Sequence, residues 1–242
     1  MTDPRLDIIT RRLEDVGKII AVSSGKGGVG KSVVASALAI RLNEKGYSVG
    51  LLDLDFTSPS SHVILGIEGL YPEEEYGIIP PSAHGLRYMS ITYYSGDKPA
   101  PLRGTDTSNA IIELLAITRW GNLDYLIIDM PPGIGDATLD VIRLVERIRF
   151  LVVCTPSKVA YETVRKQIKL LDELKIPTIG IVENMVMKQT TYVSERARED
   201  RIAYLGLIKY DSMLEEALGD VDSIKKTEFY SAITDLTEKI CR

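Results

Sequence analysis

Eight consecutive residues, Gly25 to Ser32, read GKGGVGKS and fit the pattern G-x-x-x-x-G-K-[ST] of a phosphate-binding loop. The glycines let the chain wrap around a phosphate without Cβ clashes, and Lys31 supplies positive charge to the β- and γ-phosphates. The apolar run KIIAVS (18–23) precedes the loop, and VVASALAIRLNEKG (33–46) follows it with helical spacing. Such a strand–loop–helix unit points backbone N–H groups and the positive end of a helix dipole at one spot. The chain is therefore predicted to bind a nucleoside diphosphate or triphosphate.

A second lysine, Lys26, directly follows the first glycine of the loop. At this end of the loop, the side chain either is an ordinary solvated lysine or projects outward across a subunit interface. In the second case it would add positive charge to a nucleotide held by another subunit, as an arginine finger supplied in trans does.

Three aspartates follow apolar runs that are typical of buried strands. Asp53 and Asp55 close the run VGLLDLD, and Asp129 closes LDYLIID. Because parallel sheets bind ligands at the carboxyl ends of their strands, these carboxylates are expected beside the phosphate-binding loop. Magnesium prefers oxygen ligands, so the Ser32 hydroxyl, water and phosphate oxygens would form its first shell, with Asp129 supporting it from outside.

The residues after Asp129 read MPPGIGD, and Pro131, Pro132 and Gly133 are expected to form a switch loop. Glycine permits unusual backbone torsion angles, so this turn is able to change shape with the γ-phosphate. It would be a second nucleotide-sensing segment beside the phosphate-binding loop.

Apolar runs alternate with helical patterns along the chain, which is typical of a parallel sheet covered by helices. We expect an α/β fold with a doubly wound, mostly parallel sheet and helices on both faces. Loop-rich segments are expected at 66–85 and 93–108, and the polar segment 187–200 is predicted to be mobile or helical. Because there is no repeat and no Gly/Ser linker, residues 18–242 form one predicted domain.

Residues 1–17 are predicted to form an amphipathic helix before the first strand. Leu6, Ile9, Leu13 and Val16 fall on one apolar face of this helix. That face either packs on the protein's own sheet or docks into a groove of a partner protein.

The 242 residues are 45% apolar and 26% charged, with a net charge of −5 and a pI of about 5.3. This acidity gives no electrostatic drive toward nucleic acid or anionic lipid. No apolar run approaches the roughly 18 residues that span a bilayer, and the polar N-terminus does not look like a secretory signal. The two cysteines, Cys154 and Cys241, lack the spacing of a disulfide framework or a metal site within one subunit. A cytoplasmic protein without nucleic-acid or membrane partners is expected.

Several further motifs stand in a fixed order along the chain: LLDLD followed by SPS, then LRG, LIIDMPPGIGD, TPS and GIVENM. With the loop KGGVGKS, they make residues 18–211 resemble the Mrp/MinD ATPases, which have a deviant Walker A loop and dimerise around two ATP molecules. The resemblance implies that Lys26 reaches the partner's phosphates and that Asp55 activates the attacking water. It also implies that Asp53 and Asp129 support Mg²⁺.

By the same resemblance, Asn184 hydrogen-bonds adenine and Arg103 lies near the dimer interface. Together with the loop pattern, it makes Lys26, Lys31 and Asp55 the expected catalytic residues. The expected ATP-binding residues are Gly25, Lys26, Gly27, Gly28, Val29, Gly30, Lys31, Ser32, Val33 and Asn184, and the expected magnesium residues are Ser32, Asp53 and Asp129. No guanine-reading N-K-x-D motif follows the loop, so the expected cofactors are ATP or ADP with Mg²⁺.

The chain departs from the Mrp branch at one point. Mrp-type iron–sulfur carriers usually place a C-x-x-C soon after the GIVENM segment, and two such pairs bridge a cluster through four thiolates. Here residues 186–192 read VMKQTTY, without cysteine. Cluster carriage by the usual ligands of that branch is therefore not expected.

Within the family, the stretches LLDLDF, HVILG, YPEEEYGIIPPSAHGL, TYYSGDKPAPLRG, ELLAITRW and LDYLIIDMPPGIGD resemble the archaeal, ATP-using version of the hydrogenase maturation protein HypB. This resemblance implies nickel delivery to [NiFe]-hydrogenase with the metallochaperone HypA, and the hydrogenase large subunit as a further partner. The apolar face of residues 1–17 would then be the HypA dock. His62 and His84 are isolated in loops, so nickel is not assigned to ligands.

The main expectation is a homodimeric, MgATP-dependent switch that hydrolyses ATP slowly and acts in metal-centre assembly, in the nickel-insertion branch. Two alternatives remain open: an iron–sulfur cluster carrier of the Mrp type, and a positioning ATPase of the MinD or ParA kind. The tail TEFYSAITDLTEKICR lacks the cationic face that a membrane-bound MinD-like helix needs, and the acidity of the chain disfavours DNA partition. A nucleotide sensor without turnover would use the same residues and also stays open.

Overall fold

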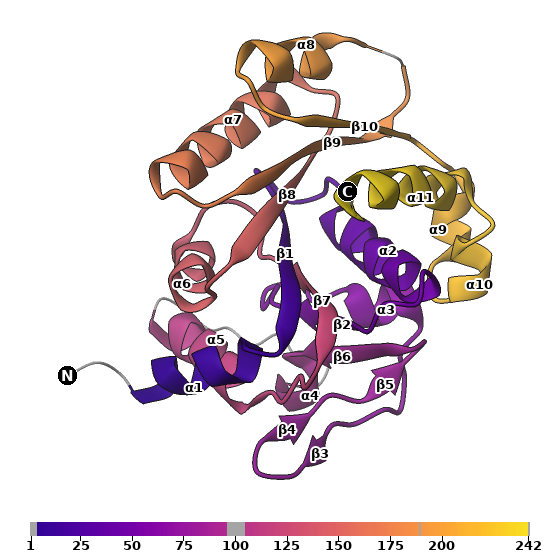
Figure 1. Cartoon of the computed structure of the whole chain (residues 1–242). Helices are drawn as coiled ribbons and strands as arrows, with labels where there is room; N and C mark the ends of the chain where they lie inside the picture. Colours follow the sequence, from indigo (N-terminus) through magenta and orange to yellow (C-terminus); the bar gives the residue numbers. More distant parts are fainter. Residues whose placement is uncertain (1–3, 96–104, 189, 242) are drawn as a thin grey trace.

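A mostly parallel sheet forms the centre of the protein (Figure 1). In the computed structural model, which describes residues 4–95, 105–188 and 190–241, eight strands pair in the order β10-β9-β8-β1-β7-β2-β6-β5. Every pairing is parallel except the last, in which β5 runs antiparallel to β6. The strands are β1 (Val16–Ser24), β2 (Val49–Asp53), β5 (Ser82–Ala83), β6 (Leu86–Ser90), β7 (Leu123–Asp129), β8 (Ile148–Cys154), β9 (Thr178–Val186) and β10 (Tyr204–Lys209).

Helices cover both faces of this sheet (Figure 1). One face packs against α1 (Pro4–Leu13), α5 (Thr105–Ile117), α6 (Asp136–Leu144), α7 (Lys158–Glu173) and α8 (Tyr192–Glu199). The other packs against α2 (Lys31–Glu44), α3 (Ser61–Leu65), α9 (Met213–Ala217), α10 (Val221–Ile224) and α11 (Glu228–Cys241). The short helix α4 (Thr92–Ser95) follows β6, and β3 (Glu73–Glu74) pairs with β4 (Ile78–Ile79) in a separate hairpin.

The central strands are apolar because both of their faces are covered. In β2 and β7 every residue except Asp124 is buried, which is the pattern expected for parallel strands between two helix layers. The predicted doubly wound, mostly parallel α/β fold is therefore confirmed.

The structure contradicts one of the two interpretations of the N-terminal helix. It ends at Leu13, and Val16 already belongs to β1, two residues before the predicted strand start. Ile9, Leu13 and Val16 are buried in the same core cluster as α5 and α6, and Leu6 packs against that cluster. The apolar face thus packs on the protein's own core, so its proposed use as a partner dock is wrong for this structure.

The loop-rich segments contain more regular structure than the sequence indicates. Residues 66–85 hold the short strands β3, β4 and β5, and the polar segment 187–200 holds α8. Part of the predicted loop 93–108 lies outside the described residues. The C-terminal segment forms α11, which packs against α2 and β10. Within the described ranges, no helix has the length and apolar character needed to cross a membrane.

Strand β9 carries a buried glutamate. Glu183 in β9 is 1% exposed, and its Oε2 accepts a 2.9 Å hydrogen bond from the hydroxyl of Tyr204, whereas its Oε1 has no hydrogen-bond partner in the described residues. Burial raises the pKa of Glu183, and the Tyr204 hydroxyl only partly offsets this effect. Folding therefore shifts the titration of Glu183 toward the protonated form.

We expect the Glu183→Gln variant to be more stable than the wild type at about pH 8, and this difference to shrink toward about pH 4. Because the pKa of Glu183 is raised in the folded state, wild-type stability falls as the pH rises above the unfolded-state pKa of about 4.3, whereas glutamine does not ionise. Urea unfolding without nucleotide measures the difference. The exposed Glu173→Gln is the control and should follow the wild type. A stability difference for Glu183→Gln that is constant with pH would contradict the prediction.

Candidate functional site

Three neighbouring strands bring the predicted residues to one edge of the sheet. β1, β7 and β2 lie side by side, with Val22 opposite Asp129 and Asp129 opposite Asp53. The phosphate-binding loop leaves the carboxyl end of β1 and leads directly into α2, which begins at Lys31. Parallel strands place their carboxyl ends at a common edge, and this geometry assembles the site.

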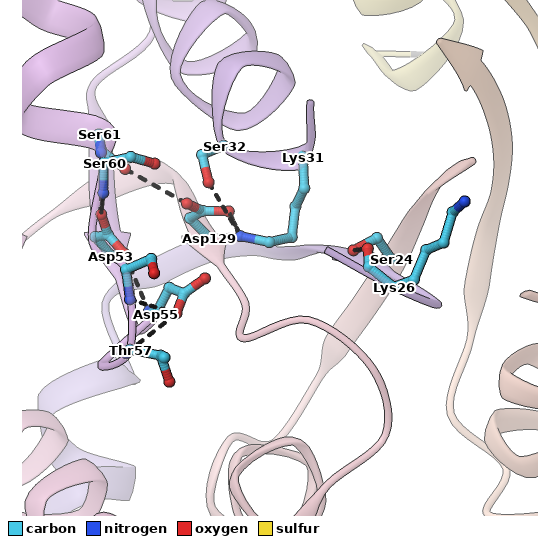
Figure 2. A network of polar contacts seen from close by, with 11 residues as sticks. Ser24, Lys26, Lys31, Ser32, Asp53, Asp55, Thr57, Ser60, Ser61 and Asp129 are labelled. Atoms are coloured by element: carbon cyan, nitrogen blue, oxygen red, sulfur yellow. Dashed lines mark hydrogen bonds and ion pairs between the residues drawn. The ribbon is translucent and has the colours of Figure 1, made fainter. Parts of the chain in front are cut away.

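Lys31 lies at the centre of the site. Its ammonium group contacts Oδ1 of Asp129 and donates a 3.1 Å hydrogen bond to the Ser32 hydroxyl (Figure 2). Lys31 is 6% exposed and Asp129 is fully buried, so the two charges are held together away from water. A buried charge is costly without a partner, and this pairing removes much of that cost.

Opposing effects act on the pKa of Asp129. Burial raises its pKa to about 6, and the neighbouring Asp53 carboxylate contributes to this rise, while Lys31 acts in the opposite direction. Two carboxylates therefore share the positive charge of one lysine. Additional positive charge at this place would relieve their repulsion.

Asp53 shapes the chain that follows it. Its Oδ1 accepts a hydrogen bond from the backbone N–H of Asp55 at 3.0 Å, and its Oδ2 accepts from the N–H groups of Ser60 and Ser61 at 3.2 and 3.1 Å. Burial raises the pKa of Asp53, and the Asp55 and Ser61 hydrogen bonds work against this rise. The Ser61 hydroxyl in turn lies 3.5 Å from Oδ2 of Asp129. Asp53 thus fixes the segment 55–61 against the site.

Asp55 is nearly buried but retains one uncommitted oxygen. Its Oδ1 accepts hydrogen bonds from the N–H groups of Thr57 and Ser58 at 3.2 and 3.1 Å, which closes a tight turn. Its Oδ2 makes no hydrogen bond within the described part of the chain, and the side chain is 7% exposed. This oxygen is available to accept a proton from water.

Lys26 is exposed and extends away from the Lys31–Asp129 pair (Figure 2). Its backbone carbonyl accepts a 2.9 Å hydrogen bond from the Ser24 hydroxyl, which fixes the start of the loop. Within the described ranges its ammonium group has no ion pair. Lys31 therefore points to the carboxylates of its own subunit, whereas Lys26 points away from them.

Asn184 supports the loop from β9. Its Nδ2 donates a 2.9 Å hydrogen bond to the carbonyl of Val29, and its side chain is 4% exposed. Gly30 has a φ of +79°, and a Cβ at this position would lie 2.4 Å from Nδ2 of Asn184. Only glycine fits both the left-handed backbone and the contact. The amide oxygen of Asn184 makes no hydrogen bond in the described residues, so it is available to a ligand.

The predicted switch loop is joined to the phosphate-binding loop. The N–H of Gly133, whose φ is +81°, donates a 2.8 Å hydrogen bond to the carbonyl of Ser24. The Thr138 hydroxyl donates a 3.1 Å hydrogen bond to the carbonyl of Gly133 and anchors the far end of the turn that follows Pro131 and Pro132. A movement of this turn therefore acts directly on the residue that precedes Gly25.

The donor set fits a magnesium ion that is bound mainly by nucleotide phosphates. The partly exposed Ser32 hydroxyl provides one oxygen, while the Asp53 and Asp129 carboxylates are engaged behind it. In the described ranges, no three His, Cys, Asp or Glu side chains form a group that could hold a metal ion alone. This arrangement suits an octahedral ion that retains waters and phosphate oxygens.

The isolated candidates for metal binding lie elsewhere. His84 has its Nε2 2.8 Å from the carbonyl of Leu65, and His62 lies in α3. Cys154 is buried in β8, and burial raises its pKa to about 12, while Cys241 lies at the end of α11. None of these four residues belongs to the carboxylate site.

Some contacts at the site are absent from the sequence prediction. The sequence predicts Lys31, Ser32, Asp53, Asp55 and Asp129 as neighbours, and the structure brings them together. It does not identify the backbone N–H groups of the SPSS stretch as ligands of a carboxylate, although a turn-rich stretch directly after DLD is a usable signal. The predicted interface residue Arg103 lies outside the described residues.

The comparison with family models matches residues 15–240 to the ParA model described as NUBPL iron-transfer P-loop NTPase. Among curated proteins, the iron-sulfur cluster carrier protein of Aquifex aeolicus is 39% identical over 222 residues, which cover 85% of this chain and 61% of that protein. The iron-sulfur cluster carrier protein of Methanococcus maripaludis is 44% identical over 171 residues, covering 69% of this chain and 59% of that protein. The chain thus spans about three fifths of the length of these relatives.

Solved structures are similar to this chain over most of its length. The nucleotide-binding protein in complex with ADP from Archaeoglobus fulgidus is 33% identical, with a TM-score of 0.77 over 91% of this chain and 93% of that chain. The cell division ATPase MinD of Pyrococcus furiosus shares the fold at 20% identity, with a TM-score of 0.68 over 93% of this chain and 98% of that chain. The match to the family model covers nearly the whole chain and includes every strand of the carboxylate site. The chain therefore belongs to the NUBPL iron-transfer P-loop NTPases and has the fold of the MinD-type ATPases.

Proposed function

We propose that the protein is a magnesium-dependent ATPase that works as a dimeric switch in iron–sulfur centre assembly. The observation that carries this proposal is the arrangement of Lys31, Asp53, Asp55 and Asp129 at one sheet edge beside an exposed second lysine, Lys26. This arrangement has a place for phosphate, a proton acceptor and a cation that faces outward. Family membership and the curated relatives support the metal-centre context.

ATP would be held by the loop that begins at Gly25. The Lys31 ammonium group now neutralises Asp129, and an entering β- or γ-phosphate would compete for it. The free amide oxygen of Asn184 is suited to accept a hydrogen bond from the amino group of adenine. Guanine carries a carbonyl oxygen at that position, so the same acceptor would disfavour GTP.

Hydrolysis would use Asp55 as the proton acceptor. The oxygen of a water molecule bonds to the γ-phosphorus, and the bond from that phosphorus to the β–γ bridging oxygen breaks. The proton lost by the water passes to Oδ2 of Asp55 and then to the phosphate product. The Ser32 hydroxyl would hold a magnesium ion, supported by Asp53 and Asp129, and the ion would supply positive charge that offsets the charge on the phosphate oxygens.

Lys26 would complete the site of a second subunit. It is exposed, it points away from its own carboxylate cluster, and it lies on a loop stiffened by Ser24. A cation supplied in trans increases phosphoryl-transfer rates by roughly 10³–10⁵ in systems where it is known. The proposed dimer therefore forms when ATP is bound and separates after hydrolysis.

The iron–sulfur context is favoured over nickel delivery. The curated relatives described above are iron-sulfur cluster carrier proteins. Neither their descriptions nor that of the matching family model mention hydrogenase, HypA or nickel. The HypA dock proposed for the N-terminal helix is also covered by the protein's own core. Nickel insertion is therefore the alternative function, and metal analysis of captured complexes would detect it.

The cysteines of this chain constrain its part in that process. Its 242 residues contain two cysteines, of which Cys154 is buried with a raised pKa. A four-thiolate cluster across a dimer needs two available thiols from each subunit. We therefore propose that the switch acts on a partner that supplies most of the cluster ligands.

We expect Asp55→Ala and Asp55→Asn to bind ATP but to lose at least about 100-fold in turnover, because neither side chain can accept the proton of the attacking water. The asparagine variant would retain an oxygen for the turn to Thr57 and Ser58, so it separates catalysis from loop shape. Phosphate release measures turnover, and light scattering after size exclusion should show dimer accumulating with ATP. The exposed Asp172→Ala is the control; full activity in Asp55→Asn would remove Asp55 from catalysis.

We expect Lys26→Ala to bind ATP within about twofold of the wild type but to lose ATP-dependent dimerisation and about 10³-fold in turnover. The loss follows because the partner's phosphates would lack a positive charge. Dimerisation is measured by light scattering with a nonhydrolysable ATP analogue, and binding by a fluorescent nucleotide. Lys166→Ala, an exposed lysine of α7, is the matched control. A Lys26→Ala protein that still dimerises with the analogue would contradict the in-trans role.

Anaerobic reconstitution tests the metal context. After incubation of the full chain with ferrous iron and sulfide, we expect no stable four-iron cluster per dimer, because too few thiols are available. Iron, sulfide and nickel are then measured in complexes captured with ATP and with ADP. A complex with ATP-dependent iron and sulfide supports the proposal, whereas nickel without iron would replace it with the nickel branch.

A further inference from the structure

A second recess is lined by residues of α3, the loop after it, β6 and α4. Figure 1 shows where these elements lie in the fold. This aromatic cleft has a volume of about 480 Å³. Val63, Leu70 and Tyr71 line its rim, and Ile67, Tyr88 and Tyr93 line its floor. The rim side chains are 60%, 38% and 76% exposed, so apolar surface is open to water here.

The surroundings of the cleft are acidic. Residues 68–75 read EGLYPEEE, with four glutamates and no lysine or arginine. Within the described residues, Glu68, Glu73 and Glu74 have no ion pair, whereas Glu75 pairs with Arg119. The half-buried Tyr94 lies within reach of this charge, because its pKa is raised first by burial and then by Glu74. Of the three glutamates without an ion pair, Glu68 lines the cleft, and Glu73 and Glu74 follow the rim residue Tyr71 by two and three positions.

The floor of the cleft contains unsatisfied polar atoms. His62 Nδ1, Tyr88 Oη and Tyr93 Oη are buried without a hydrogen-bond partner in the described ranges. Ser90 is near enough to affect the pKa of Tyr88, but it makes no hydrogen bond of good geometry with it. A buried polar group without a partner destabilises the folded protein, so an inserted group that offers hydrogen bonds to these atoms would be favoured.

We propose that the aromatic cleft docks a cationic segment of a partner protein, which inserts an apolar side chain between Val63 and Tyr71 and places lysines or arginines against Glu68, Glu73 and Glu74. The exposed rim supplies the apolar contact, and the unpaired glutamates select a positively charged partner. The surface is part of neither the phosphate-binding loop nor the N-terminal helix.

The cleft also shares an element with the nucleotide site. Ser61 binds Asp53 through its N–H and Asp129 through its hydroxyl, and the next two residues of α3, His62 and Val63, line the cleft. A nucleotide that draws Lys31 away from Asp129 would therefore change the anchor of α3. Docking and nucleotide binding would then affect each other by the same factor. This coupling rests on the proposed function, whereas the docking site itself does not.

Fluorescence anisotropy with a defined probe tests the docking site. The probe is a fluorescein-labelled peptide of lysine and leucine with the leucines on one helical face. We expect it to bind the nucleotide-free full chain, and Leu70→Ser with Tyr71→Ser to weaken binding by at least about tenfold. Leu174→Ser, at an exposed leucine at the end of α7, is the matched control and should bind within about twofold of wild type.

Charge variants test the selectivity of the cleft. Glu73→Lys with Glu74→Lys should weaken binding, and Asp172→Lys with Glu173→Lys, which change the net charge equally at two exposed acids of α7, should not. Circular dichroism checks that all variants are folded. Equal losses in the cleft variants and their controls would overturn the proposal, because the probe would then respond only to the net charge. Absence of binding to the wild type would overturn it as well.

The coupling is measured separately with a nonhydrolysable ATP analogue and Mg²⁺. A change in the Kd of the probe of about threefold or more, with an equal change in analogue affinity when the probe is bound, supports the coupling. An unchanged Kd, with analogue binding confirmed by a fluorescent nucleotide, overturns the coupling and leaves the docking site. Failure of the analogue to bind at all would overturn the proposed ATPase function and not the cleft.

Discussion

The buried ion pair between Lys31 and Asp129 is the interaction on which the site depends. It links the first turn of α2 to the end of β7, and Asp129 in turn reaches Asp53 through Ser61. A pair of this kind adds little to stability, because removing two charges from water costs nearly as much as their attraction returns. The ion pair matters mainly because it fixes the positions of Lys31 and Asp129. The lysine that phosphate would need is held in the site without phosphate, and its partner carboxylate is poised to receive other positive charge.

The rest of the architecture serves this pairing. β1, β7 and β2 must be neighbours for a loop and two carboxylates from distant parts of the sequence to meet. The helices on both faces keep the strand interiors dry, which strengthens every charge interaction at the strand ends. In the segment that follows β2, the N–H groups of Ser60 and Ser61 bind Asp53, so one carboxylate organises the chain that carries Asp55. The same few contacts thus set both the conformation of the segment after β2 and the placement of the charged groups in the site.

The sequence predicts much of this arrangement, for physical reasons that also explain its limits. Glycine spacing and acidic strand ends have few alternative explanations, so Lys31, Asp53 and Asp129 were predictable as neighbours. The face of Leu6 and Ile9 was not decided, because an apolar stripe fits a core and a partner equally well, and only the position of α5 shows which one covers it. The Lys31–Asp129 contact could not be predicted because it depends on side-chain reach in three dimensions.

The strand order also has a consequence for biosynthesis. β1 is made before both of its neighbours, β7 and β8, and Val16 pairs with Leu123 more than a hundred positions later. The central strand must therefore stay unpaired until β7, more than a hundred residues later, has been made. Such distant pairings slow folding and leave an apolar edge open to aggregation during translation. A nascent chain of this protein would be a client for chaperones until β8 emerges, and Asp129 would join the phosphate-binding loop only after β7 has been made.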